Sequence, residues 1–74
     1  MKTSDITDAQ VCRAYAEWAD SRDLFADQVL MLMTGAPYKV ALRAMERSAR
    51  RGLVEWGVSL RSGWLTERGK ALLA

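Results

Sequence analysis

Apolar residues recur at helical spacing near the start of the chain, at Val11, Tyr15, Trp18 and Ala19. This spacing turns one side of a helix towards a core, so we predict a helix over residues 8–21. The residues before it form a capping box, in which the side chains of Thr7 and Gln10 each accept a hydrogen bond from the other's amide. Ile6 and Val11 are placed to form the hydrophobic staple of this helix start.

A polar stretch, residues 20–23, interrupts the apolar pattern and offers residue types that cap helices. We therefore expect a second helix to begin near Leu24. Its inward side is expected to carry four apolar residues, Phe25, Val29, Leu32 and Met33. Gly35 can take the left-handed conformation that ends a helix, and Pro37 suits the first position of the next one. The sequence thus predicts two helices joined by a tight turn.

A third helix is expected over residues 37–51, because Gly52 can end it. After it the apolar residues alternate with others, which is the period of a half-buried strand. The inward side of this strand is expected to carry Val54, Trp56, Val58 and Leu60. Residues 61–63 offer a turn and residues 64–66 can return antiparallel, so we predict a hairpin over residues 53–66.

Thr66 can cap a short last helix over residues 67–73, whose Leu72 and Leu73 are expected to pack on the core. These elements predict a mainly α fold with one small β-hairpin, an α+β arrangement of three helices, the hairpin and a short C-terminal helix. The 74 residues suffice for a single domain over residues 1–74. Residues 1–5 carry no such pattern and are expected to be disordered.

The composition argues against several classes of protein. Half of the residues are hydrophobic, as in a folded domain. The longest apolar run, residues 29–33, is far shorter than the roughly 20 residues of a membrane span, and the first residues lack the features of a signal peptide. We therefore expect a cytoplasmic protein with no membrane partner. Histidine is absent and Cys12 is the only cysteine, so we expect no metal site, no cofactor and no enzymatic activity. We expect Cys12 itself to lie at the surface or at the boundary of the core, without a functional role.

Basic residues gather on the third predicted helix. A helix advances about 100° per residue, which places five cations within an arc of roughly 120°: Lys39, Arg43, Arg47, Arg50 and Arg51. Small and apolar residues lie opposite, and Glu46 borders the arc. The net charge is only +2, so the placement of the charges matters more than their total. A basic stripe on the second helix of a helix-turn-helix suits the major groove of double-stranded DNA.

The position of each residue suggests its role on DNA. The first part of the helix would contact bases, its far end would contact phosphates, and the small residues of the turn would let backbone amides approach a phosphate. Arg61, near the tip of the hairpin, would reach the minor groove or its phosphates. The candidate DNA-binding residues are Thr34, Tyr38, Lys39, Leu42, Arg43, Arg47, Arg50, Arg51 and Arg61.

The order of these elements, with Arg51-Gly52-Leu53-Val54 before the hairpin and Leu65-Thr66-Glu67-Arg68-Gly69 after it, resembles winged helix-turn-helix regulators of the MarR and PadR types. The resemblance covers roughly residues 26–73 and implies a recognition helix at residues 37–51, a wing at the hairpin and a role in transcription regulation. Ser48 stands where these regulators usually carry a large apolar residue. The chain has no counterpart of their long terminal dimerisation helices, so the resemblance implies neither a dimer nor an effector pocket. Residues 33–38 and 57–61 also resemble small phage or prophage proteins of unknown function.

Other interpretations stay open. A basic helix face is often only a solvated surface. The mixed charges of the first helix, Arg13 with Glu17 and Asp20, favour instead a winged-helix module that binds a protein in a phage or bacterial assembly. Tyr38 either contacts DNA or packs on Leu42. The three tryptophans lie on apolar faces, which favours core or boundary positions over base stacking. The oligomeric state is open between a monomer and a weak dimer.

Overall fold

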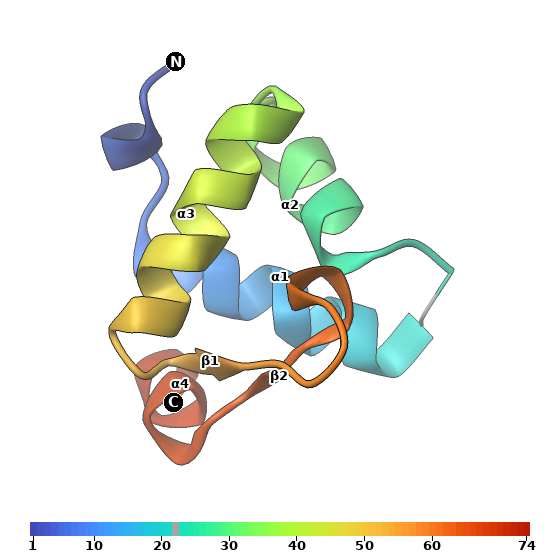
Figure 1. Cartoon of the computed structure of the whole chain (residues 1–74), viewed down its shortest axis with the longest axis vertical. Helices are drawn as coiled ribbons and strands as arrows, with labels where there is room; N and C mark the ends of the chain where they lie inside the picture. The colour runs from blue at the N-terminus through green and yellow to red at the C-terminus, as the bar shows by residue number, and fades with distance from the viewer. Residues whose placement is uncertain (22) are drawn as a thin grey trace.

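Four α-helices and a two-stranded antiparallel sheet form the described part of the chain, residues 1–21 and 23–74 of the computed structural model (Figure 1). In chain order they are α1 (Asp8–Ser21), α2 (Ala26–Thr34), α3 (Tyr38–Arg50), β1 (Val54–Glu55), β2 (Trp64–Leu65) and α4 (Glu67–Leu73). The predicted α+β composition is confirmed. No helix in these ranges is long and apolar enough to cross a membrane.

The start of α1 is formed by the predicted capping box. The amide of Thr7 donates to Oε1 of Gln10 over 2.8 Å, and the amide of Gln10 donates to Oγ1 of Thr7 over 3.1 Å. Ile6 and Val11, the predicted staple, are both buried. The residues before the box differ from the expectation, because Thr3–Asp5 form a 3-10 helix instead of a disordered end. Cys12 is buried as well, contrary to the expected surface or boundary position.

Helix α2 begins later and is turned differently from the prediction. Its N-cap is Phe25, whose amide donates to the side chain of Gln28 over 2.8 Å. Arg22, part of the polar stretch expected to cap it, lies outside the described residues. The buried side carries Ala26, Asp27 and Leu30, whereas Leu32 is 76% exposed. Residues 29–33 are all apolar, so their spacing alone does not indicate which side faces the core.

The turn between α2 and α3 follows the predicted chemistry. Gly35 has a φ of 75°, and its amide donates to the carbonyl of Met31 over 2.8 Å. Pro37 is the N-cap of α3 and not its first helical residue. The predicted end of α3 is confirmed at Gly52, which has a φ of 76°. The buried side of α3 carries Ala41, Ala44, Met45 and Ser48.

The hairpin is much shorter than the predicted one. Only Val54 with Leu65 and Glu55 with Trp64 are paired. From residue 56 the chain leaves the sheet, so Trp56 and Val58, expected on the inward side, are 52% and 99% exposed. We call residues 56–63 the β1–β2 loop. It bends back towards the helices because the hydroxyl of Tyr15 donates to the carbonyl of Leu60 over 2.5 Å.

Helix α4 packs against α1, and its start is held beside residues 52–53, which follow α3. Thr66 accepts a hydrogen bond from the amide of Gly69, as predicted, and its hydroxyl also donates to the carbonyl of Gly52 over 2.6 Å. A Cβ atom at Gly69 would lie 2.2 Å from the carbonyl oxygen of Leu53, so only glycine permits this close approach. Leu73 packs against the core, whereas Leu72 is 46% exposed.

One carboxylate, that of Asp8, joins the start of α1 to the far half of α3. Its Oδ1 accepts hydrogen bonds from Oγ of Ser48 (2.7 Å) and Nε of Arg47 (3.2 Å), and its Oδ2 accepts one from Nη1 of Arg51 (2.6 Å). The same Arg47 guanidinium donates to the carbonyls of Thr3 and Ile6. Ser48 is fully buried, and its hydroxyl is satisfied by Asp8, which gives a reason for a small polar residue at this position.

The charge of Asp8 contributes to the stability of this arrangement. Partial burial raises the pKa of Asp8, but the hydrogen bonds from Ser48 and Arg51 and the positive charges of Arg47 and Arg51 outweigh that effect, so its pKa lies below the ordinary 3.8. A lowered pKa in the folded state means that the ionised carboxylate stabilises the fold above about pH 3.8. This contribution is lost as the pH falls through the folded-state pKa.

We expect Asp8→Asn to lower the free energy of unfolding by about 1–2 kcal/mol at pH 7, because the amide replaces a charged acceptor of three hydrogen bonds. The difference from the wild type should shrink as the pH falls below about 3.8 and through the lowered pKa of Asp8 in the folded state, where Asp8 itself becomes protonated. Urea unfolding across this pH range measures it. Asp20→Asn, at an exposed carboxylate on the same helix, is the control. A difference equal at pH 7 and at about pH 2 would contradict the role of the charge.

Candidate nucleic-acid interface

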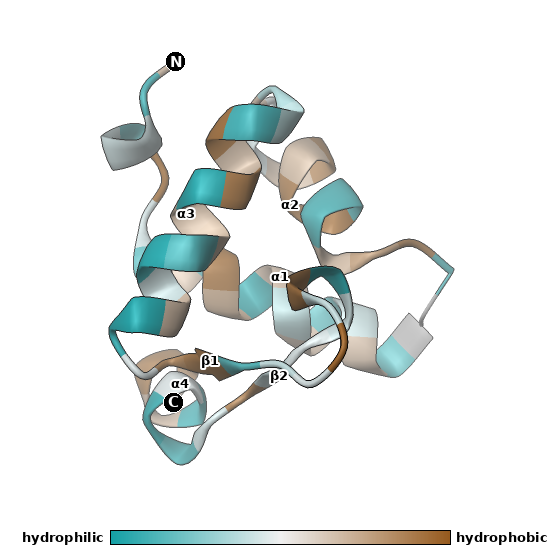
Figure 2. Ribbon diagram, viewed as in Figure 1, coloured by the Kyte–Doolittle hydropathy of each residue, from teal (hydrophilic) through white to brown (hydrophobic). Residues whose placement is uncertain are grey.

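The outer side of α3 presents three cations and one carboxylate to solvent: Lys39, Arg43, Glu46 and Arg50. All four are exposed, and the hydrophilic side of α3 is turned outward in Figure 2. None of the three cations forms an ion pair with an acidic side chain in the described ranges. At about 100° per residue these four positions fall within roughly 60°, so Glu46 shares the basic face and does not merely border it.

Arg47 does not share this face, contrary to the expectation that five cations point outward. Its side chain is 16% exposed, and all its described contacts are with Asp8 and with two backbone carbonyls of the N-terminal segment. Arg51 combines both situations, because its side chain is 58% exposed to solvent while one of its nitrogens pairs with Asp8. The basic face therefore consists of Lys39, Arg43 and Arg50, with Arg51 at its edge.

Arg61 is also placed differently from the expectation. Its Nε donates to Oδ1 of Asp27 over 2.8 Å, and its guanidinium lies 4.1 Å from the ring centroid of Phe25. Asp27 is 1% exposed, so this carboxylate requires a cationic partner. Arg61 thus fastens the β1–β2 loop to α2 and does not extend from a hairpin tip. The residue that does project from this loop is Val58, at 99% exposure.

The remaining candidates lie around the start of α3. Thr34 is half-buried, and its hydroxyl donates to the carbonyl of Leu30 and accepts from the amide of Ala36, so it stabilises the turn. Tyr38 is 44% exposed. Leu42 is half-buried beside the basic face.

A shallow open groove of about 500 Å³ runs between α3 and the β1–β2 loop. Leu42, Ala49 and Leu60 form its apolar lining, Trp56 is half-exposed on one side, and Glu46 and Arg50 border it from the basic face. The sequence pattern gave no indication of this groove. The predicted straight strand would have carried Trp56 inward, whereas the bend after residue 55 exposes its ring next to α3.

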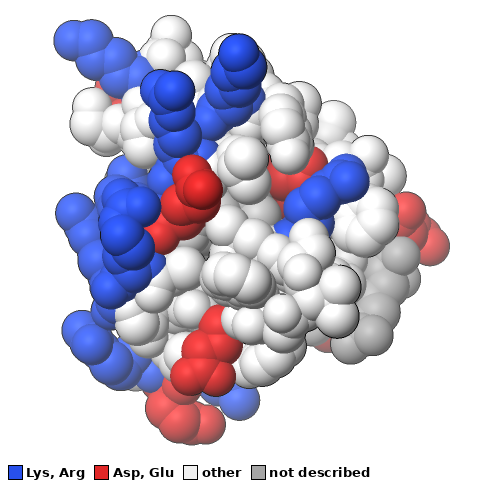
Figure 3. Space-filling model, viewed as in Figure 1, with Lys and Arg blue, Asp and Glu red and all other residues white. Residues whose placement is uncertain are grey.

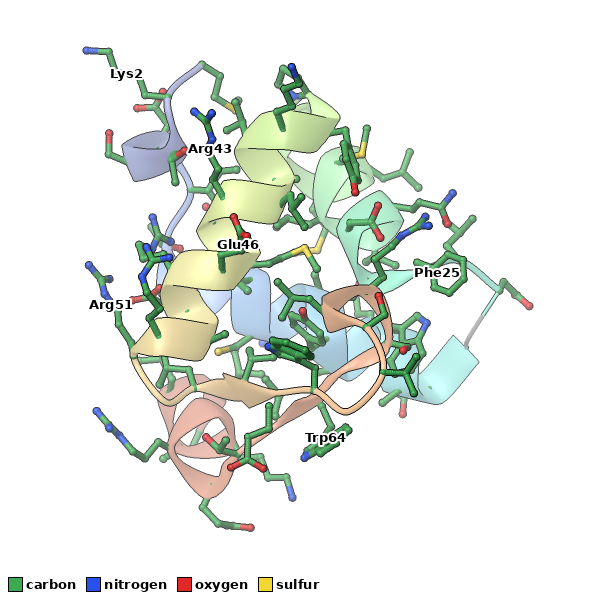
Figure 4. All side chains as sticks on the ribbon, viewed as in Figure 1. Lys2, Phe25, Arg43, Glu46, Arg51 and Trp64 are labelled. Atoms are coloured by element: carbon green, nitrogen blue, oxygen red, sulfur yellow. The ribbon has the colours of Figure 1, made fainter. Side chains whose placement is uncertain are left out.

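The basic surface is longer than α3 itself. Figure 3 shows Lys and Arg side chains along one edge of the molecule, over the N-terminal segment, α3 and the region of α4, with acidic side chains beside them. Figure 4 places Arg43 and Arg51 on this outer edge and Glu46 on the side towards the viewer. At its far end lies Arg68, because a Cβ built at Gly52 would be 3.2 Å from its Nη1. Arg68 follows α3 only in space, so helical spacing gave no indication of it.

The described residues do not gather three or more His, Cys, Asp or Glu side chains that could hold a metal ion. Comparison of the chain with protein-family models, characterised proteins and solved structures gives no match. The surface chemistry of α3 and its surroundings is therefore the basis for any functional argument.

We expect Arg61→Ala to lower the urea concentration at the midpoint of unfolding, because it leaves the buried Asp27 carboxylate without its cation. Hydrogen exchange should also become faster in residues 56–63, which lose their attachment to α2. Arg50→Ala, at an exposed arginine without a described ion pair, is the matched control and should change stability by less than about 0.5 kcal/mol. Equal stability losses in the two variants would contradict this role for Arg61.

Proposed function

We propose that this chain is a non-enzymatic module that binds double-stranded DNA through the outer face of α3, as a small transcription regulator of the winged helix-turn-helix type. The observation that carries the proposal is the set of three exposed cations, Lys39, Arg43 and Arg50, that face one side of a single helix without an acidic partner in the described ranges. Phosphates would take the place of the missing acidic partners. Such a protein would act in the cytoplasm.

The arrangement around α3 supports the proposal. Helices α2 and α3 are joined by the three residues 35–37, and the antiparallel strands follow α3, which is the chain order of a helix-turn-helix with a wing. The major groove admits one α-helix. With α3 in that groove, Arg51 and Arg68 at its far end are placed to meet phosphates, and the projecting β1–β2 loop serves as the wing.

Glu46 gives the face a chemistry beyond simple attraction to phosphate. A carboxylate repels phosphates, but in the major groove it can accept a hydrogen bond from the N4 amino group of cytosine, while arginine donates to guanine. Arg43 and Glu46 lie three residues apart and are neighbours on the helix surface. We propose that this pair contacts bases and that Lys39, Arg50 and Arg51 contact the backbone.

The proposal is tested by fluorescence anisotropy of a labelled duplex between about 50 and 200 mM salt. Four phosphate contacts are proposed, from Lys39, Arg50, Arg51 and Arg68. They give a slope near −3.6 when the logarithm of the binding constant is plotted against the logarithm of the salt concentration, and a dissociation constant of about 1–100 μM is expected for a random sequence. Arg50→Gln should weaken binding and reduce the slope by about 1. Lys70→Gln, which removes the same charge from α4, is the matched control. Undetectable binding at low salt, or a salt-independent affinity, would show that α3 is only a solvated basic surface.

A second candidate function is a winged-helix module that binds a protein. The groove with the half-exposed Trp56 and the apolar Leu42 and Leu60 favours it, because an aromatic anchor beside an apolar cleft is typical of protein contacts. In that case Trp56→Ala would abolish binding to the partner, whereas Arg43→Gln, on the basic face but outside the groove, would leave it largely unchanged.

A further inference from the structure

The face formed by α1, α2 and α4 carries apolar side chains that nothing in the described structure covers. Four of them form what we call the apolar band: Leu24, Leu32, Met33 and Leu72. Their exposures are 38%, 76%, 39% and 46%. An exposed leucine is ordinary by itself, but contiguous large apolar side chains indicate a contact surface.

Three grooves connect the members of the band. A groove of about 420 Å³ and one of about 370 Å³ share Leu24 and Leu32, and the second of these shares Met33 with a third groove of about 320 Å³. Leu72 and Leu73 line this third groove. The surface therefore has raised leucines on both sides of Met33 and a hollow beside each of them.

Charges flank the band on opposite sides of Met33. Arg13 lines the groove next to Leu72, and Glu17 lines the groove next to Leu32. Both are exposed, and neither forms an ion pair with a charged side chain that the structure describes. They lie four residues apart on α1, about 6 Å along its axis. A surface with one cation and one carboxylate about a central apolar residue is complementary to itself.

We propose that a second copy of this chain covers the apolar band, in a two-fold symmetric dimer with Met33 near the axis. In a two-fold contact the same surface of each copy is buried against the other. Each contact between two different residues therefore occurs twice, once in each direction. Leu32 of each copy enters the groove beside Leu72 of the other copy. Arg13 of each copy pairs with Glu17 of the other, which gives two symmetric ion pairs. The basic face of α3 lies outside this contact, so the inference does not depend on DNA binding.

Sedimentation equilibrium up to about 1 mM protein, without DNA, tests the dimer, whose dissociation constant is expected between about 10 μM and 1 mM. Leu32→Asp should be monomeric throughout this range. Val58→Asp adds the same charge at a 99% exposed apolar residue of the β1–β2 loop and should dimerise like the wild type. A wild-type monomer at about 1 mM would overturn the proposal and leave the band to a different partner.

The two charged residues provide a test that does not depend on the fold tolerating Leu32→Asp. Arg13→Glu and Glu17→Arg should each weaken the dimer by about tenfold or more, because like charges then meet at two symmetric places. An equimolar mixture of the two variants should form a heterodimer at least as tight as the wild-type dimer, since every contact again joins opposite charges. A mixture as weak as the separate variants would overturn the proposed geometry, whatever the outcome of DNA binding.

Discussion

The carboxylate of Asp8 is the constraint on which the rest of the arrangement depends. It lies at the start of α1 and accepts hydrogen bonds from three residues of the far half of α3 and its end, so it fixes the rotation of α3 about its own axis. Ser48 is fully buried by this contact, and Arg47 is drawn in to the N-terminal segment. With Ser48 facing the core, the helical period turns Lys39, Arg43 and Arg50 outward, whereas Arg47, about 40° from Arg43 around the helix, is held at the flank by Asp8.

The basic residues have two roles, which depend on whether they pair with a carboxylate of low exposure. Cations that meet a carboxylate of low exposure, Arg47 with Asp8 and Arg61 with Asp27, hold parts of the fold together. Removing the arginine would leave a carboxylate with little water and no counter-charge, which is costly. The cations of the outer face have no acidic partner in the described ranges, so their long side chains are available to bind a polyanion. With a net charge of only +2, the molecule depends on this separation for any attraction to DNA.

The features that could be predicted from the sequence are those decided within a few residues. The capping box of Thr7 and Gln10, the left-handed Gly35 and Gly52, and the cap at Thr66 all involve partners no more than five positions away. The placement of Arg47 and Arg61 could not be predicted, because their partners lie 39 and 34 positions away. The buried side of α2 was predicted wrongly for another reason, because five consecutive apolar residues indicate no preferred side of the helix.

The central claim is that Arg47 and Arg61 are held by carboxylates of the fold, whereas Arg43 and Arg50 are exposed and available to contact DNA. It is tested most directly by following the Nε–H signals of the arginine side chains by NMR while a duplex is added. We expect the signals of Arg47 and Arg61 to be slow in exchange with water and unmoved by DNA, while those of Arg43 and Arg50 shift. Shifts at Arg47 and Arg61, with Arg43 and Arg50 unchanged, would contradict the account.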